Sequence, residues 1–583
     1  MKTRFTICFL LAAPGVVAAE ASTASRTRPD FGLVFNDDAD LSFVVPDRTK
    51  SEALLQANIA ALADTPVRTL VYCIGMGGDV LYYNTRVASR VGWRKAPDEV
   101  PGSLMAKRME NARVCLAEGA DAVRTAGETA KRLGLRFIPS LRMNDAHFMA
   151  NPDQHSMTSE FWFKHRHEFT IKDSPWSFQP AYGNLLDYSH APVRQLRLDT
   201  AFEVLDRNRD FVDGFELDFN RFQVFFPKGQ AAAGAPLITE IVRRVRGRLD
   251  ELAREQQRPM QLCVRVPPSL ADCATAGLEV ERWIREGWVD LVSPAQIMTL
   301  AGDMPINDLV MLARKHGVRI HPSLYPRTSW RLPFPPNGPD RYAGATVTRE
   351  ATLAEIRGAA TAYRVLGVDG FYLFNFYNAF GSLRPHDDRL FHAFRDLARP
   401  ENLIGQSSVH VVTKSYYHDG PGSYAYGKQL PAKLLAGAAA LRLTLTVAEH
   451  PAAAAYPLQT CELRVGFRGM PVEASVAIAL NGAEIFRGRP ADGAQVSTRQ
   501  VTGTALKQLD LAEDYLHVPL SVPGPLKHGE NVFTLTFADG AGKSGEVTDV
   551  EVRFDYQNDY EQLWLRAPVE LNRPANAGAP SPR

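Results

Sequence analysis

The chain has 583 residues, of which 45% are hydrophobic and 22% are charged, and its formal net charge is +1. These values are typical of globular protein, and a near-neutral chain without a long basic run gives no reason to expect a nucleic-acid partner. The length exceeds what one ordinary hydrophobic core supports, so we expect two or three domains.

Residues 1–21 have the order of a secretory signal peptide. Lys2 and Arg4 precede an apolar stretch from Phe5 to Leu11, small residues follow through Val17-Ala18-Ala19, and we expect cleavage after Ala19 or Ala21. No later segment approaches about 20 uninterrupted apolar residues, so we expect no membrane span. The sequence therefore predicts a soluble protein that is secreted or periplasmic, and it leaves the oligomeric state open.

The cysteines fit neither a zinc site nor a catalytic thiol. Those that follow the signal peptide are Cys73, Cys115, Cys263, Cys273 and Cys461, and their spacings match no zinc pattern. Buried thiols are the main expectation, with a Cys263–Cys273 bridge as the alternative in an oxidising compartment. We expect no metal and no cofactor.

Helical and strand patterns alternate from residue 65 to residue 401, after a lead-in segment (22–64) that contains one helix at Ser51–Ala63. The predicted strands are Arg68–Gly78, Arg136–Asp145, Phe211–Phe226, Met260–Pro268, Trp288–Met298, Gly317–Pro326 and Gly367–Asn378. The predicted helices are Met109–Leu133, Val193–Arg207, Leu237–Glu255, Glu279–Glu286, Asn307–Lys315 and Leu353–Leu366.

Strands that alternate with helices over this length predict an α/β fold, a (β/α)₈ TIM-like barrel with insertions. One strand is not identified, and we expect it between Asp79 and Gly119. A doubly wound open sheet is the alternative, but no Gly-x-Gly-x-x-Gly motif follows the first strand.

The pattern of apolar and polar residues changes after residue 401. Short stretches of alternating apolar and polar residues replace the helical spacing, and Asn481-Gly482 is a hairpin signal. Residues 402–565 therefore predict a C-terminal all-β sandwich domain. Residues 566–583 are rich in Pro and Ala, and we expect them to be disordered.

The segment FVDGFELDFNRFQVFF (Phe211–Phe226) carries the strongest chemical signal. Residues two apart on a strand share a face, so Glu216, Asp218 and Asn220 point one way and the intervening apolar residues the other. Carboxylates that face a covered interior are costly unless they are paired or functional. A solvated acidic strand or an ion pair with Arg221 is the alternative to a catalytic role.

Other polar and aromatic residues are expected to gather at the carboxyl ends of the barrel strands or in the insertion 146–191. Such a rim suits a hydroxyl-rich ligand better than a phosphate cofactor. The predicted substrate-binding residues are Asp79, Arg142, Asn144, Asn220, Arg265, Gln296, His321, Tyr325, Asn375, Asn378, Trp162 and Trp176. Packing of the insertion's own core is an equal alternative for its aromatic residues.

One stretch of about forty residues, LLDYSHAPVRQLRLDTAFEVLDRNRDFVDGFELDFNRFQVFFP, resembles glycosyl hydrolase-like family 10 proteins, in which the segment reads roughly L-D-P-x-H-P-x-V-R, helix, V-D-G-I-H-x-D. The matching positions are Leu186-Asp187, His190, Val193-Arg194, Val212-Asp213-Gly214 and Asp218. The resemblance implies a secreted glycosidase-type barrel with a β-rich appendage. The chain departs from the pattern at Glu216, where the family tends to have His, and at Phe219, where a second acid is common.

Glycoside cleavage typically uses one carboxylic acid that protonates the leaving oxygen and one carboxylate that attacks or activates water. We expect Asp218 to be the nucleophile or electrostatic stabiliser, Glu216 to be the acid/base or to tune Asp218, and Asp145 to be the reserve acid. The predicted function is hydrolysis of a polysaccharide or oligosaccharide, with anionic sugars favoured if Arg142, Arg265 and their neighbours make the mouth basic. The alternatives are a non-catalytic glycan-binding envelope protein and a polysaccharide lyase that uses His321 and Tyr325.

Overall fold

The computed structural model describes residues 30–75, 79–175, 180–296, 299–331, 346–376, 388–412, 429–503, 506–538 and 543–557. The predicted signal peptide (1–21), the predicted C-terminal tail (566–583), Trp176 and Asn378 lie outside these residues. No helix among the described residues is long and apolar enough to cross a membrane. The five described cysteines are all buried and all free, so Cys263 and Cys273 are not bridged.

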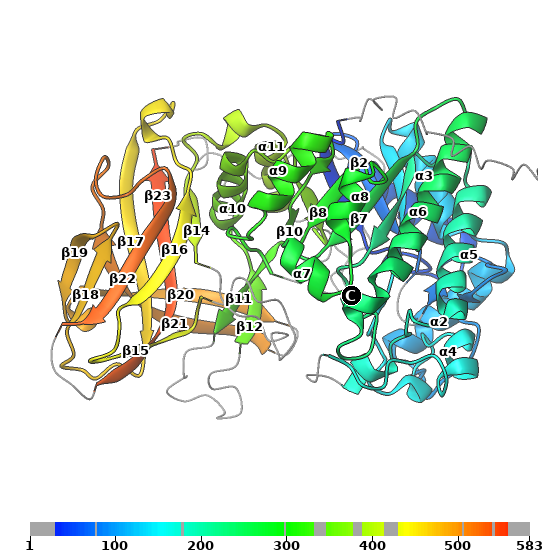
Figure 1. Cartoon of the computed structure of the whole chain (residues 1–583), viewed down its shortest axis with the longest axis horizontal. Coiled ribbons are helices and arrows are strands. Elements are labelled where there is room, and N and C mark those ends of the chain that lie inside the picture. Colours follow the sequence, from blue (N-terminus) through cyan, green and yellow to red (C-terminus); the bar gives the residue numbers. More distant parts are fainter. Residues whose placement is uncertain are drawn as a thin grey trace, which may run out of the picture.

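One parallel sheet organises the first two thirds of the chain (Figure 1). Its strands are β1 (Leu33–Asp37), β2 (Val67–Cys73), β5 (Arg136–Arg142), β6 (Gly214–Asp218), β7 (Gln261–Val266), β8 (Leu291–Pro294), β9 (Arg319–Ile320), β10 (Ser323–Leu324) and β13 (Tyr372–Phe374). Their order is β10-β13-β1-β2-β5-β6-β7-β8-β9. Only two residues separate β9 from β10, and Ala295 after β8 bridges Ser323 in β10. The two ends of the curled sheet therefore meet.

The strand expected between Asp79 and Gly119 comes instead from the lead-in segment. There, β1 pairs in parallel with both β2 and β13. Between Asp79 and Gly119 the described strands are β3 (Val80–Leu81) and β4 (Ser89–Arg90), which pair with each other outside the parallel sheet. A strand of five residues that is buried on both faces carries no alternation to identify it.

Helices connect the strands and cover the outer face of the sheet (Figure 1). They are α1 (Arg48–Ala60), α2 (Leu104–Ala117), α3 (Ala122–Arg132), α4 (Glu160–His165), α5 (Ala191–Arg207), α6 (Ala231–Glu255), α7 (Leu270–Thr275), α8 (Val280–Arg285), α9 (Asn307–His316), α10 (Leu353–Leu366) and α11 (Asp388–Ala398). The single helix expected at Met109–Leu133 is two helices. Gly119 adopts a φ of +86° after α2, and the Asp121 side chain caps the start of α3.

Two antiparallel sheets follow. The larger has the order β14-β23-β17-β21-β20 with β15 beside β23, and the smaller has the order β16-β22-β18-β19. Their strands are β14 (Ser408–Val411), β15 (Ala432–Leu435), β16 (Leu441–Val447), β17 (Leu458–Arg468), β18 (Val476–Leu480), β19 (Ala483–Gly488), β20 (Ala494–Gly503), β21 (Leu506–Pro519), β22 (Gly529–Phe537) and β23 (Ser544–Tyr556). Buried residues of both sheets form one hydrophobic cluster. A separate pair, β11 (Arg327–Arg331) and β12 (Thr346–Glu350), lies between the two parts (Figure 1).

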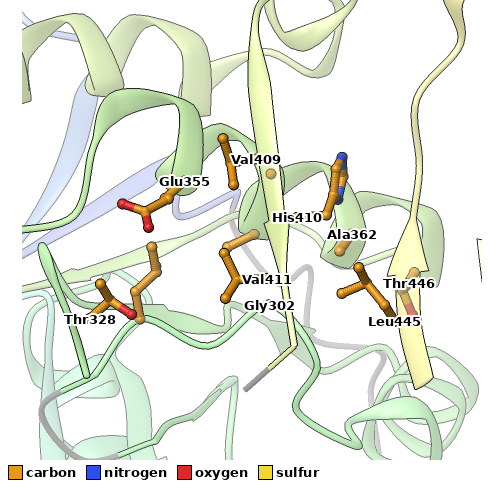
Figure 2. A pocket seen from close by; sticks show the side chains of 12 residues that line it. Gly302, Thr328, Glu355, Ala362, Val409, His410, Val411, Leu445 and Thr446 are labelled. Carbon is orange, nitrogen blue, oxygen red and sulfur yellow. The ribbon is translucent and has the colours of Figure 1, made fainter. Parts of the chain in front are cut away.

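Helix α10 holds the antiparallel sheets against the barrel-like part. A Cβ atom added at Gly358 of α10 would lie 2.1 Å from the carbonyl oxygen of Val409 in β14, so the helix and the strand touch through their backbones. A pocket at this contact is lined by Glu355 of α10, by His410 of β14 and by Thr446 of β16, among others (Figure 2).

Candidate functional site

Strand register brings the charged residues of β5, β6 and β7 into one layer. In the strand register, Arg142 of β5 lies opposite Asp218 of β6, and Asp218 lies opposite Arg265 of β7. Because side chains alternate along a strand, Glu216 lies on the same face as Asp218, one layer toward the amino ends. Its contact with Tyr372 of β13 crosses the interior of the curled sheet, so this face is the inner one.

Glu216 is a buried carboxyl group with one oxygen that accepts no hydrogen bond from the described residues. Its Oε1 accepts hydrogen bonds from the hydroxyls of Ser140 (2.7 Å) and Tyr372 (3.0 Å), whereas Oε2 has no partner among these residues. Only 1% of the residue is exposed. Burial, followed by the nearby charge of Asp218, raises the pKa of Glu216 to about 7. A protonated Glu216 can therefore donate from Oε2 at neutral pH.

Asp218 is held in a buried ion pair. Both of its carboxylate oxygens lie 3.1 Å from Nη1 of Arg265, and the backbone N–H of Asn220 donates to Oδ1 at 2.9 Å. The Arg265 guanidinium lies over the ring of Phe374, 3.8 Å from its centroid. The partner of this carboxylate is thus Arg265 on the next strand rather than Arg221.

Arg142 connects two further carboxylates at the same rim. Its guanidinium lies 2.8 Å from Asp38, which follows β1, and 3.0 Å from Asp145, which follows β5. Burial alone would raise the pKa of Asp38, but Arg142 and Arg221 outweigh it and lower that pKa. Burial also acts to raise the pKa of Asp145, but His147 and Arg142 outweigh it and hold that pKa well below its usual range. Both groups are charged at neutral pH.

His147 and Arg221 complete this network. The His147 Nδ1 lies 2.6 Å from Asp145, and its Nε2 lies 3.0 Å from Nη2 of Arg221. An arginine can only donate, so Nε2 accepts and the proton of a neutral His147 sits on Nδ1. The sequence did not identify four residues of the site, namely Asp38, His147, Ser140 and Tyr372. His147 has a weak signal in its position two residues after Asp145, but Asp38 follows a strand that the sequence does not reveal.

Three of the predicted amides form hydrogen bonds that connect residues at the carboxyl ends of the strands. Asn144 donates to the carbonyl oxygens of Leu186 and Val224, and it ties the insertion to the end of β5. Asn220 donates to the carbonyl of Ala295 at 2.9 Å, which links the end of β6 to the end of β8. The Asn375 side chain hydrogen-bonds Asp38. Gln296, the other predicted amide that the structure describes, is buried, and its Oε1 has no hydrogen-bond partner among the described residues.

One predicted residue, His321, lies away from the mouth. His321 is fully buried edge-on against Phe31, which precedes β1, and its ring touches the position of Gly370, which precedes β13. It therefore lies at the amino ends of the strands, and burial lowers its pKa to about 4. Tyr325 follows β10 at its carboxyl end and packs against Phe374, the ring over which Arg265 lies. His321 and Tyr325 therefore lie toward opposite ends of the strands, which contradicts a lyase base and acid that meet at the mouth.

The insertion's tryptophan packs rather than faces a ligand. Trp162 is 4% exposed, and its Nε1 donates to the carbonyl of Asn184 at 2.7 Å. Its ring contacts Phe163 edge-on. The insertion's own core therefore accounts for Trp162.

Asp79 lies beside the network rather than in it. Its carboxylate pairs with Arg197 of α5, and both residues line a small cleft together with Arg142 and Asp145. Arg142 and Arg265 are both occupied by carboxylates of the chain itself. The contacts of these two arginines therefore do not support a basic mouth.

No family model and no curated protein matches the sequence. Among solved structures the chain is similar to a cycloisomaltooligosaccharide glucanotransferase from Paenibacillus, with 10% identity and a TM-score of 0.30 over 89% of this chain and 57% of that chain. It is similar to a cell-surface-expressed chitinase of Paenibacillus, with 10% identity and a TM-score of 0.36 over 89% of this chain and 56% of that chain. It is also similar to the catalytic domain of chitinase B from Arthrobacter, with 12% identity and a TM-score of 0.38 over 67% of this chain and 98% of that chain.

The chain thus spans little more than half of the length of the first two. Likenesses this distant carry no argument about the fold or the activity of this chain. Its function is therefore inferred from the residues of the site.

Proposed function

We propose that the protein is an exported glycoside hydrolase, a (β/α)₈ barrel followed by a β-sandwich, related to glycosyl hydrolase-like family 10 proteins. The observation that carries the activity is Glu216, a buried carboxyl group whose pKa is raised to about 7 and whose Oε2 has no hydrogen-bond partner among the described residues. A general acid works best when its pKa lies near the working pH. The paired carboxylate of Asp218 stands two residues away on the same face.

In this mechanism Glu216 protonates the oxygen of the leaving sugar from Oε2. The hydroxyls of Ser140 and Tyr372 both donate to Oε1, which orients the group and leaves the proton on the other oxygen. As the bond between the anomeric carbon and the leaving oxygen breaks, Asp218 either stabilises the positive charge on the sugar ring while water adds to that carbon, or attacks the carbon to form an ester that water then hydrolyses. Arg265 fixes the orientation of the Asp218 carboxylate. The backbones of the two residues are separated by about 6.5–7 Å along the strand. Retention of configuration needs carboxyl groups about 5–5.5 Å apart and inversion needs them about 6.5–9.5 Å apart, so the direction of the two side chains decides between the two routes.

The test compares wild type with Glu216→Gln on a panel of neutral and anionic glycans, with new reducing ends as the readout. We expect the variant to lose about 100-fold or more of the rate, since glutamine keeps the shape and the hydrogen bonds but has no acidic proton. Glu281→Gln is the matched control, because Glu281 lies on α8 with a half-exposed side chain paired to Arg285. Equal rates for wild type and Glu216→Gln would refute the assignment.

A non-catalytic glycan-binding protein is the second candidate. It is favoured by the ion pairs that occupy the other carboxylates of the rim, because Asp38 and Asp145 are held by Arg142 and Asp218 by Arg265. A carboxylate neutralised in this way is a weaker nucleophile. Binding of a glycan without any new reducing ends would favour this candidate over hydrolysis.

A further inference from the structure

The strand that supplies Tyr372 to Glu216 also supplies an aromatic ring to the partner of Asp218. On β13, Tyr372 and Phe374 are two residues apart and therefore share the inner face of the curled sheet. The Tyr372 hydroxyl donates to Glu216, and the ring of Phe374 faces the guanidinium of Arg265, with 3.8 Å between the guanidinium carbon and the ring centroid. β13 is thus linked to both carboxyl groups of β6, to one directly and to the other through Arg265.

The hydrogen bonds of Arg265 to Asp218 do not by themselves fix the guanidinium. Both contacts come from one nitrogen, Nη1, so the pair is not the two-nitrogen fork that fixes the plane of a guanidinium against a carboxylate. A contact through one nitrogen leaves the rest of the group able to turn about it. The face of an aromatic ring attracts a cation most strongly where water is excluded, and Arg265 and Phe374 are only 1% and 2% exposed.

Phe374 is itself held in place. Its strand lies between β1 and β10, and its ring packs against that of Tyr325, with 6.0 Å between the centroids. Both rings belong to a buried cluster inside the curled sheet. Arg221 lies farther from the Phe374 ring, 5.7 Å from its centroid, and hydrogen-bonds His147. Arg265 is therefore the closer of these two guanidiniums to the ring.

We propose that Phe374 is a positioning residue for the reaction: its ring holds the Arg265 guanidinium on the Asp218 carboxylate and so keeps the negative charge beside Glu216 compensated. The inference rests on the proposed function for the part that Glu216 plays as the acid. Phe374 acts through Arg265 rather than on the sugar.

The groups around Glu216 that carry a charge at neutral pH are few. The titratable or charged groups that face it are Asp218 on its own strand, Cys263 and Arg265 on β7 and Tyr372 on β13, while β5 contributes the neutral hydroxyl of Ser140 and, opposite Asp218, Arg142. Burial raises the pKa of the Cys263 thiol and of the Tyr372 hydroxyl well above their ordinary values, so both are neutral.

This charge balance gives the sign of the expected effect. The charge of Asp218 raises the pKa of Glu216, and Arg265 lowers it. If the guanidinium of Arg265 turns away, the pKa of Glu216 therefore rises further. If the loss of the ring only admitted water, the effect of burial would weaken and the pKa would fall. The direction of the change thus separates positioning of Arg265 from mere filling of space.

The test replaces Phe374 with trifluorophenylalanine, introduced through a reassigned stop codon. Fluorine atoms withdraw electrons from the ring face and weaken its attraction for a cation, while the ring still fills its place. Phe374→Leu is the second variant, which removes the ring face altogether. Phe35 is the matched control for both changes, because it is a fully buried ring on the neighbouring β1 that packs against Phe394 of α11.

The protonation of Glu216 is read without a substrate. The readout is the infrared C=O stretch of its protonated carboxyl group, obtained at each pH as the spectrum of a chain minus that of the same chain with Glu216→Gln. We expect both changes at Phe374 to raise the pKa of Glu216 by about half a pH unit or more, and both changes at Phe35 to leave it unchanged. The decline of kcat/KM at high pH should move upward by the same amount.

A pKa of Glu216 that is unchanged or lower in the trifluorophenylalanine chain would overturn the inference, and this chain decides if Phe374→Leu fails to fold. Failure of the proposed function is distinguishable. A wild-type chain that releases no reducing ends, but whose Glu216 pKa rises with trifluorophenylalanine at position 374, keeps the role of Phe374 in the ion pair and refutes hydrolysis. Hydrolysis that depends on Glu216, with no such rise, refutes the role of Phe374 alone.

Discussion

At the scale of single residues, the candidate site separates one protonated acid from three carboxylates that are held by arginine. Asp38, Asp145 and Asp218 each lie within 3.1 Å of a guanidinium. Glu216 is instead held by two neutral hydroxyls. Burial and the nearby charge of Asp218 raise the pKa of Glu216 by more than Arg265 and the two hydroxyls lower it, which is why the proton resides on Glu216.

The protonation of Glu216 predicts a pH dependence of stability. The folded chain holds this proton up to a pH of about 7, whereas the unfolded chain releases it near the ordinary value of 4.5. The folded state therefore binds more protons in this window, so its free energy of unfolding falls as pH rises from about 4.5 through 7. Between pH 4.5 and pH 7, the free energy of unfolding of wild type is expected to fall by on the order of 3 kcal/mol more than that of Glu216→Gln.

Urea denaturation of both proteins at pH 5 and pH 8 measures this difference. Parallel changes in the two proteins would contradict the raised pKa, because glutamine does not titrate.

The Asp218–Arg265 pair predicts non-additive effects on stability. Arg265→Met leaves the carboxylate of Asp218 buried without its cation, and we expect a loss of about 3–5 kcal/mol. Combining it with Asp218→Leu removes both charges and should restore much of that loss. Thermal or urea unfolding of the two single variants and the double variant gives the coupling. A double variant that is as unstable as the sum of the single variants would contradict a buried, mutually compensating pair.

At the scale of elements, most strands of the parallel sheet could be predicted from the sequence, and β1 could not. The pattern around Glu216 and Asp218 predicts the correct face because alternation is a local property of the segment. β1 has no alternation and only five residues, so its role depends on pairing with β2 and β13, which lie far away in the sequence.

The partners within the site were beyond prediction for the same reason. Arg265 meets Asp218 because of the register between β6 and β7, and Tyr372 meets Glu216 across the interior of the sheet. Neither relation can be read from one sequence. The burial of His321 at the amino ends of the strands likewise depends on Phe31 and Gly370, which are distant in the chain.

The position of β1 predicts where the barrel-like part must begin. A chain shortened to start at residue 65 lacks the strand that joins β2 to β13 and exposes the edges of both. We expect this chain to be insoluble or to unfold without a cooperative transition, whereas one that starts at residue 30 should unfold like the full-length protein. Circular dichroism during thermal unfolding distinguishes them. A cooperative transition at the full-length Tm in the shorter chain would show that β1 is dispensable.

At the scale of the whole molecule, the barrel-like part and the C-terminal antiparallel sheets are joined by a close contact between α10 and β14. Besides the approach of Gly358 to Val409, Arg357 of α10 donates to Asp396 of α11 at 2.8 Å and to the carbonyl of Ser407 before β14 at 3.4 Å. Val409 and Val411 extend from β14 beside Glu355 in the pocket at this junction (Figure 2). The C-terminal sheets therefore brace the barrel-like part from the side of α10.

Gly358→Ala tests this junction. The added Cβ would lie 2.1 Å from the backbone oxygen of Val409, which a side-chain rotation cannot relieve, so α10 and β14 must separate. We expect a loss of about 1–3 kcal/mol in the free energy of unfolding. Gly247→Ala in α6 is the matched control, since no described atom lies within 4 Å of its added Cβ, and it should stabilise the protein by about 0.5–1 kcal/mol. Similar effects of both substitutions in urea denaturation would contradict a backbone contact between the parts.

The pH dependence of kcat/KM for wild type on its best glycan substrate tests the central claim most directly. If Glu216 donates the proton, kcat/KM falls tenfold per pH unit above a pKa of about 7, and the residual rate of Glu216→Gln lacks this decline. A rate that stays constant from pH 6 to pH 9, or a decline that persists unchanged in Glu216→Gln, would contradict a proton donated by Glu216.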